Sequence, residues 1–227
     1  MLKKFFVFVV LSVVILSSCR TTKVVKGRTT NENIEWSSTR VNGANKTDLP
    51  RVLIIGDSHV DAYFDAVVKA LEGKAYLCKF TTSKSMGDPV FLEQLEEMLK
   101  QYRFDVISFN NGLHSGAYSA EEYAAFIPNV YKLLTKYGNP KIQWVNTTAM
   151  RDSHNLQILR AFNANIVKGN EYVNAFASKK NIPVIDDYSL SIAHQEFYQN
   201  DGVHFTPEGV AAESHNVIQG ILALLKR

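Results

Sequence analysis

Short strand-like runs alternate with stretches of helical periodicity along most of the chain. Five such runs predict strands, at residues 52–55, 75–80, 105–109, 141–146 and 183–186. The first run is apolar throughout, as in a parallel strand that is buried on both faces. Apolar residues at helical spacing occupy the segments between and after these runs. Strand followed by helix, five times over, predicts a parallel sheet with helices on both faces and the strand order 2-1-3-4-5.

Several of the expected helices have recognisable starting points. Ser119-Ala-Glu-Glu122 is a capping-box sequence and opens a helix that reaches about residue 137. Thr206 and Pro207 are the residue types of an N-cap and a first helical position, so the last helix is expected at 207–225. Apolar residues from Leu156 onward predict one long helical region over residues 156–180.

The first 49 residues differ from the rest of the chain. Residues 1–19 combine a basic start with an apolar run shorter than the ~20 residues of a membrane span, which is typical of a signal peptide. The run ends Leu16-Ser17-Ser18-Cys19, which resembles the lipobox of bacterial lipoproteins, where the cysteine is lipidated and becomes the mature N-terminus. Residues 20–49 are polar and are expected to tether this lipid anchor to one domain at residues 50–227. The expected location is the bacterial cell envelope, on a membrane, facing the periplasm or the cell surface.

Composition narrows the possible partners. A chain of 227 residues with 46% hydrophobic residues is expected to form one domain with a substantial core. The formal net charge of +3 argues against a nucleic-acid partner. If Cys19 carries a lipid, Cys78 has no disulfide partner and is most simply a small buried apolar residue. No Cys/His spacing indicates a zinc site, and we expect no metal or other cofactor.

A candidate nucleophile lies at the end of the first predicted strand. Gly56-Asp57-Ser58 comes where the strand turns into a helix, at the sheet edge where open α/β folds bind ligands. A helix N-terminus there offers free N–H groups to a developing negative charge. Near the end of the chain, Asp201 and His204 lie three residues apart, so one turn brings both side chains to one face. A serine nucleophile needs such a histidine base, and the base needs a carboxylate that fixes its tautomer.

Gly56-Asp57-Ser58 together with Asp201-Gly-Val-His204, followed by Phe-Thr-Pro-Glu-Gly, resembles the SGNH (GDSL-type) hydrolase family from about Arg51 to the end of the chain. The resemblance implies a flavodoxin-like three-layer α/β/α sandwich and a serine esterase. It makes Ser58 the nucleophile, His204 the base and Asp201 the partner of the base. The Gly-x-Ser-x-Gly elbow of the α/β-hydrolases is absent at Ser58, which disfavours that fold.

The resemblance also implies an oxyanion hole that includes the N–H groups of Ser58 and Gly87. Its third donor comes from a motif that is usually Gly-x-Asn-Asp in the family, whereas this chain has Asn110-Asn111-Gly112-Leu113-His114. Aligned on the glycine, His114 takes the place of the asparagine. Asn110, Asn111 and His114 are therefore all candidates for the third donor, with Asn111 slightly favoured over His114.

The expected activity is hydrolysis of carboxylic esters, and the resemblance suggests O-acetyl or other short acyl esters on carbohydrate. Arg151, after the fourth predicted strand, is a candidate substrate contact or an exposed loop residue without function. Two other functions stay open. One is a non-catalytic glycan-binding lipoprotein of the same fold, suggested by the departure in the third motif. The other is a sugar O-acyltransferase that uses the same triad.

Overall fold

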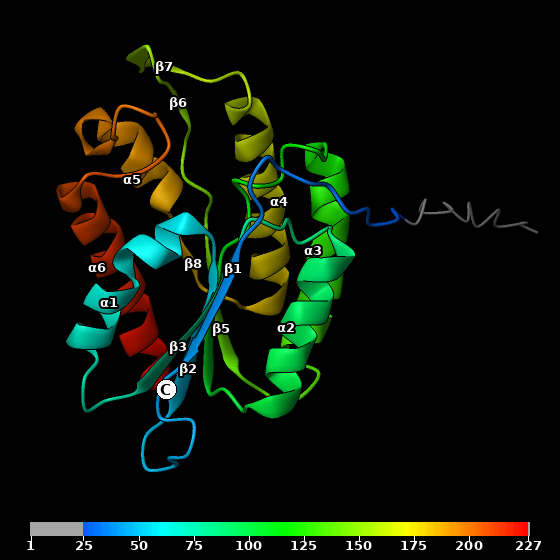
Figure 1. The fold of residues 1–227 in the computed structure, drawn as a ribbon, viewed down its shortest axis with the longest axis vertical. Coiled ribbons are helices and arrows are strands. Elements are labelled where there is room, and N and C mark those ends of the chain that lie inside the picture. The colour runs from blue at the N-terminus through cyan, green and yellow to red at the C-terminus, as the bar shows by residue number, and fades with distance from the viewer. Residues whose placement is uncertain (1–24, 227) are drawn as a thin grey trace, which may run out of the picture.

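The computed structural model describes residues 25–226, which contain the predicted parallel sheet (Figure 1). Neighbouring parallel strands follow the order β3-β2-β4-β5-β8, which is the predicted order 2-1-3-4-5. Their bounds are β2 (Arg51–Gly56), β3 (Tyr76–Thr82), β4 (Val106–Phe109), β5 (Lys141–Val145) and β8 (Val184–Ile185). The predicted fold class is confirmed, and the strand that leads to Ser58 lies inside the sheet.

Helices cover both faces of the sheet (Figure 1). One layer contains α1 (Ser58–Ala70), α5 (Asp187–Ala193) and α6 (Pro207–Leu225), and the other contains α2 (Pro89–Gln101), α3 (Ala120–Leu134) and α4 (Asn163–Lys180). Each layer packs on its own apolar set: Val52 and Ile54 of β2 belong to the core under α1 and α6, and Leu53 and Ile55 belong to the core under α2 and α3. This alternation explains why β2 is apolar from Val52 to Ile55 without interruption, since side chains of a strand point to opposite faces in turn.

An additional strand, β1 (Ser37–Val41), extends the sheet beyond β3 and runs antiparallel to it. It lies within residues 20–49, for which the sequence predicts a tether. Residues 25–36 also contact the domain: Lys84 Nζ donates to Thr30 O at 3.1 Å, and Trp36 N donates to Ser83 Oγ at 3.1 Å. A tether therefore does not describe residues 25–49. The segment is polar because it is held by main-chain pairing and side-chain hydrogen bonds at an edge, which need no apolar pattern.

The long helix predicted for residues 156–180 begins later than expected. Residues at its predicted start form an antiparallel hairpin of β6 (Arg151–Asp152) and β7 (Asn155–Leu159), which projects from the molecule (Figure 1). Ile158 and Leu159 are 55% and 38% exposed. The prediction was wrong for residues 156–162, because the spacing of these apolar residues does not reflect burial against a core.

The signal peptide predicted for residues 1–19 and its lipidation site Cys19 lie outside the described residues. Between residues 25 and 226 the structure has no helix with the length and apolarity needed to cross a bilayer.

Candidate active site

Ser58 is the first residue of α1 and follows directly on the end of β2. Asp57 caps the helix, because its carboxylate accepts the N–H of His59 at 3.1 Å. The first turn of a helix has N–H groups without intrahelical acceptors, and no described residue accepts the N–H of Ser58. The Ser58 hydroxyl thus lies at the carboxyl edge of the sheet, beside a backbone N–H that can stabilise a negative charge.

Asp201 and His204 lie on the loop that precedes α6. Asp201 Oδ1 accepts the N–H groups of Val203 and His204, both at 2.9 Å, and this local turn orients the carboxylate. Its other oxygen, Oδ2, lies 2.6 Å from Nδ1 of the His204 ring. Gly202 has a φ of +70°, a left-handed conformation that a glycine adopts without strain. The turn therefore places both side chains on one face, as their spacing predicts.

The structure brings Ser58, His204 and Asp201 together in one hydrogen-bonded chain. His204 Nε2 lies 2.9 Å from Ser58 Oγ, on the opposite side of the ring from Asp201. Because the carboxylate can only accept, the His204 tautomer carries its proton on Nδ1, and Nε2 is left to accept the proton of the serine hydroxyl. This is the geometry of a nucleophile, a base and a group that orients the base.

The charge on Asp201 is stabilised by its surroundings. Partial burial acts to raise the pKa of the Asp201 carboxyl, but hydrogen bonds from the His204 ring and from two backbone N–H groups outweigh it and hold the pKa below its usual value. Asp201 is therefore ionised at neutral pH and can stabilise an imidazolium at His204.

Two arginines of the β6–β7 hairpin region anchor this loop. The N–H of Arg151 donates to the carbonyl of Gly202 at 2.7 Å, and Arg160 Nη2 donates to the carbonyl of Asp201 at 2.6 Å. Both bonds reach main-chain carbonyls of the loop, and neither uses the Asp201 carboxylate.

The Arg151 side chain, a candidate substrate contact in the sequence, is only 5% exposed. Its guanidinium donates to the carbonyls of Leu156 at 2.9 Å, Ser191 at 3.1 Å and Ile192 at 2.9 Å, and it lies 5.0 Å from the ring centre of Tyr198. These donors hold α5 against the hairpin. The structure therefore places Arg151 in a supporting position rather than at an open surface.

The structure also locates the candidate oxyanion donors beyond Ser58. Gly87 is buried at the turn before α2, and its N–H lies 3.5 Å from Ser85 Oγ. Asn111 is 1% exposed and engaged at both ends, because Oδ1 accepts the N–H of Met86 at 2.5 Å and Nδ2 donates to the carbonyl of Lys84 at 2.9 Å. Asn111 thus holds together the two loops that follow β3 and β4.

The two other candidates for the third donor, Asn110 and His114, have different hydrogen-bond partners. Asn110 Nδ2 donates to the carbonyl of Val145 at 2.8 Å. His114 is partly exposed, and its Nδ1 lies 2.7 Å from Glu32 Oε1 in the segment before β1. Glu32 accepts the Nδ1 proton, so His114 Nε2 becomes a donor only when the ring is doubly protonated.

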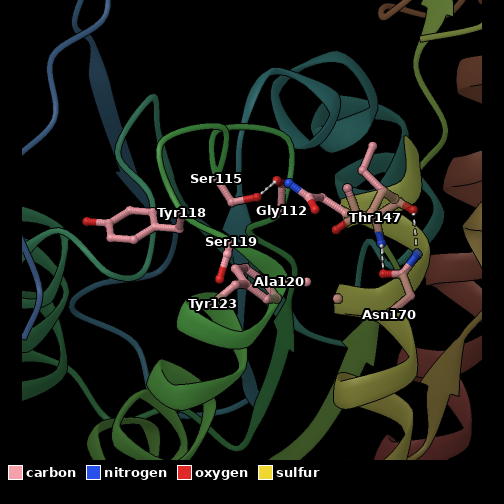
Figure 2. Close-up of a pocket in the computed structure, with 11 residues that line it drawn as sticks. Gly112, Ser115, Tyr118, Ser119, Ala120, Tyr123, Thr147 and Asn170 are labelled. Carbon is pink, nitrogen blue, oxygen red and sulfur yellow. Dashed lines mark hydrogen bonds between the residues drawn. The ribbon is translucent and has the colours of Figure 1, made fainter. Parts of the chain in front are cut away.

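Figure 2 shows how the loop that carries His114 is fixed between β5 and α4. A Cβ on Gly112 would come within 1.8 Å of Thr147 Oγ1, so only a glycine permits this contact. Asn170 of α4 accepts the Thr147 N–H and donates to the Thr147 carbonyl, both at 2.9 Å. Ser115 Oγ donates back to the Gly112 carbonyl at 2.5 Å.

The sequence did not reveal a buried ion pair behind the triad. His59 and Glu213 are 7% and 3% exposed, and His59 Nδ1 lies 3.1 Å from both oxygens of the Glu213 carboxylate. A signal was present in the last helix: Glu213 lies on the same stripe as Val217 and Ile221, where an apolar residue is expected.

Comparison with known proteins gives no match to a family model and none to a curated protein. Solved structures do match. A GDSL-like lipase from Bacteroides thetaiotaomicron superposes with a TM-score of 0.59 at 20% identity, over 77% of this chain and 88% of that one. A member of the lipolytic G-D-S-L family from Veillonella parvula gives 0.60 at 16% identity, over 74% and 96%. The acetylxylan esterase Axe2 from Geobacillus stearothermophilus gives 0.61 at 15% identity, over 76% and 94%.

These similarities agree with the residues that carry the resemblance in the sequence. Among the described residues, no group of three or more His, Cys, Asp or Glu side chains is arranged to hold a metal ion. The parallel sheet with its strand order, and the solved structures that superpose on it, show that this chain has the fold of the GDSL-type (SGNH) hydrolases.

Proposed function

We propose that this protein is a serine esterase that hydrolyses short acyl esters on carbohydrate. The observation that carries the proposal is the continuous hydrogen-bonded chain from Ser58 Oγ through His204 to Asp201, with distances of 2.9 and 2.6 Å. A structural role alone does not call for a serine, a histidine and a carboxylate in this order at a ligand-binding sheet edge.

In the first half-reaction, Ser58 Oγ attacks the ester carbonyl while His204 Nε2 takes the hydroxyl proton. Asp201 stabilises the imidazolium that forms and keeps its ring in place. The negative charge of the tetrahedral intermediate develops beside the N–H of Ser58, at the N-terminus of α1, where the helix dipole also favours it.

The proton held by His204 then passes to the leaving alcohol, which completes the first half-reaction and leaves the acyl group on Ser58. In the second half-reaction, water loses a proton to His204 and attacks the acyl-enzyme. Ser58 Oγ departs from the acyl carbon and takes that proton back from His204, which frees the acid and restores both residues. An acceptor sugar in place of water would give acyl transfer through the same steps.

A glycan ester fits the exposure of the site. The side chains of His204 and Asp201 are 45% and 48% exposed, so the triad lies at the surface, where a bulky polymer can reach it. Proteins of this fold include the acetylxylan esterase Axe2 from Geobacillus stearothermophilus. Both points support acetylated carbohydrate over a substrate that must enter a deep apolar pocket.

The test begins with a fluorophosphonate probe on the purified domain, wild type beside Ser58→Ala. We expect labelling of the wild type only. The same pair is then assayed on acetylated xylan and on p-nitrophenyl esters of increasing chain length, with products analysed in the presence and absence of an acceptor sugar. Release of acetate by the wild type alone supports the proposal. A folded wild type that neither reacts with the probe nor cleaves any ester would make this a binding protein.

The lipid anchor at Cys19 is a separate proposal, because residues 1–24 lie outside the described structure. It is supported by the basic start, the apolar run and the terminal small residues before Cys19. Metabolic labelling of the full chain with a fatty-acid analogue should mark the wild type and not Cys19→Ser. Equal labelling of both would exclude this anchor.

A further inference from the structure

The residues that neighbour the nucleophile and the base are themselves bonded to each other. His59 follows Ser58, Val203 precedes His204, and His59 Nε2 lies 3.1 Å from the Val203 carbonyl oxygen. This contact runs beside the Ser58–His204 hydrogen bond of 2.9 Å. Two adjacent bonds therefore join the start of α1 to the loop that carries the base.

The other ring nitrogen of His59 faces an anion. Nδ1 lies 3.1 Å from both carboxylate oxygens of Glu213 in α6. A neutral imidazole has one N–H and one lone pair, so it can satisfy only one of its two acceptors, Glu213 and the Val203 carbonyl. The imidazolium has an N–H on each nitrogen and satisfies both. The geometry therefore selects the charged form of His59.

The surroundings of His59 also favour its charged form. Burial acts to lower the pKa of His59, but the charge and hydrogen bond of Glu213 outweigh it, with a smaller contribution from Asp57, and raise the pKa to about 9. Buried Asp187 on α5 lies near the pair, and its own pKa is raised to about 8, first by burial and then by the charge of Glu213. Tyr63 of α1 faces the same carboxylates, which together with burial raise its pKa well above its usual value.

The position of the His59–Glu213 pair is also compatible with a positive charge on His204 during the reaction. The rings of His59 and His204 are stacked, with centroids 6.2 Å apart and an interplanar angle of 21°. An isolated cation at this distance would disfavour the imidazolium that His204 becomes during the reaction. The carboxylate of Glu213 compensates the charge of His59. The His59 ring also lies edge to face with the ring of Phe205, with centroids 4.8 Å apart, which restricts its movement.

We propose that His59, held as an imidazolium by Glu213, is a positioning residue that fixes the Val203–His204 peptide and keeps the base within reach of Ser58. Its kinetic consequence rests on the esterase function proposed above. Loss of the Val203 bond frees the loop on the side that faces α1, and a displacement of about 1 Å at a reacting group lowers kcat by about 10²-fold.

The test compares variants that remove or retain the donor without leaving a buried charge. In His59→Phe/Glu213→Leu, apolar side chains replace the pair, a change that buried ion pairs often tolerate, and the Val203 carbonyl loses its donor. In His59→Gln/Glu213→Gln, the amide of the residue at 59 can still donate to Val203. His215→Gln is the matched control, because His215 is an exposed histidine on the same helix α6.

With p-nitrophenyl acetate, we expect kcat of the apolar pair to fall by about 10²-fold with little change in KM, because the bond positions a group and does not bind substrate. The amide pair should recover most of kcat, and His215→Gln should match the wild type. An apolar pair that folds and keeps wild-type kcat would overturn the proposal.

The pH profile gives an independent readout that a purely structural role would not change. Wild-type kcat should fall above about pH 9, where His59 loses the proton that bonds Val203. Glu213→Gln removes the main cause of the raised pKa and supplies an amide N–H that Nδ1 can accept, so neutral His59 keeps its Nε2 proton for Val203. This alkaline limb should therefore be absent in Glu213→Gln and in the amide pair. A limb that stays in place in Glu213→Gln would contradict the assignment to His59.

Histidine NMR separates this proposal from the esterase function. The ring signals of His59 should titrate with a pKa near 9 in the wild type, and those of His204 should shift in the apolar pair and return in the amide pair. These NMR measurements do not require the protein to turn over a substrate. If the wild type cleaves no ester, the function proposal fails, while unchanged His204 signals in the apolar pair would overturn the positioning role.

Discussion

Gly202 permits a direct test of how closely the loop that carries Asp201 and His204 is held. It lies between Asp201 and His204 with a φ of +70°, and a Cβ built on it would lie 2.1 Å from the carbonyl oxygen of Arg151. That atom belongs to the backbone and cannot rotate away. To reach the 3.0 Å that marks the lower limit of ordinary Cβ contacts, the two segments must separate by about 0.9 Å.

Gly202→Ala should therefore affect both stability and catalysis. The left-handed conformation costs a non-glycine residue about 1–2 kcal/mol, which in a domain of this size lowers Tm by roughly 2–8 °C. The separation of about 0.9 Å moves His204 relative to Ser58, and a shift of this size lowers kcat by about 10²-fold. We expect kcat to change more than KM, because His204 acts on the reacting atoms in the proposed mechanism.

Gly73 supplies the matched control. Its φ is +71°, but a Cβ at this position meets no atom within 4 Å, and it lies in the turn after α1 at the opposite end of that helix from Ser58. Gly73→Ala should show the same strain in calorimetry and wild-type kcat on p-nitrophenyl acetate. If both variants lose the same activity, or if Gly202→Ala keeps wild-type kcat, the inferred coupling between loop position and catalysis is refuted.

Three further predictions concern single residues. Asp201→Asn should lower kcat by about 10⁴-fold at neutral pH without unfolding the protein, since the wrong His204 tautomer is then favoured; steady-state kinetics with circular dichroism checks this. Arg151→Met should lower the free energy of unfolding by about 3 kcal/mol or more in urea titrations, because three carbonyls lose a charged donor. A raised KM with unchanged stability would instead indicate that Arg151 contacts the substrate. The folded-state pKa is about 9 for His59 against 6.5, and about 8 for Asp187 against 3.8, so folding favours both protonated forms. The stabilisation from Asp187 is lost between about pH 3.8 and about pH 8, and that from His59 between about pH 6.5 and about pH 9. The free energy of unfolding should therefore fall between about pH 6.5 and about pH 8, where both groups act together, and a flat or rising curve in urea titrations would contradict this.

Elements that are buried on both faces were predictable from the sequence, because their residues are apolar. The central residues of β2, Val52 to Ile55, are all apolar because each face of the strand meets a helix layer, and this pattern is visible in the sequence. The order of the parallel strands follows from short, right-handed connections between them. Two motifs far apart in the sequence named Ser58, His204 and Asp201, and the fold places these side chains within hydrogen-bonding distance of one another.

Elements held by main-chain pairing or by polar contacts were not predictable in the same way. β1 reads Ser37-Ser-Thr-Arg-Val41, with no apolar alternation, because an edge strand can be held by its ladder to β3 alone. Leu156 and Leu159 have helical spacing but lie in a hairpin, where neither is buried. Asn111 forms hydrogen bonds with two backbone groups of the loop after β3. These partners approach Asn111 only in the tertiary structure, so a sequence motif does not indicate them.

The path of residues 25–41 also limits the distance between a lipid at Cys19 and the edge of the sheet at which Ser58 lies. Because β1 runs antiparallel to β3, the chain enters the domain at the carboxyl edge of the parallel strands, where Ser58 also lies (Figure 1). If Cys19 carries a lipid, six residue steps separate it from Val25, a reach of at most about 22 Å at ~3.6 Å per residue. A free tether over residues 20–49 would reach about 110 Å at the same ~3.6 Å per residue. Anchored in this way, and with the esterase function proposed above, the protein would reach only esters that lie close to the membrane surface.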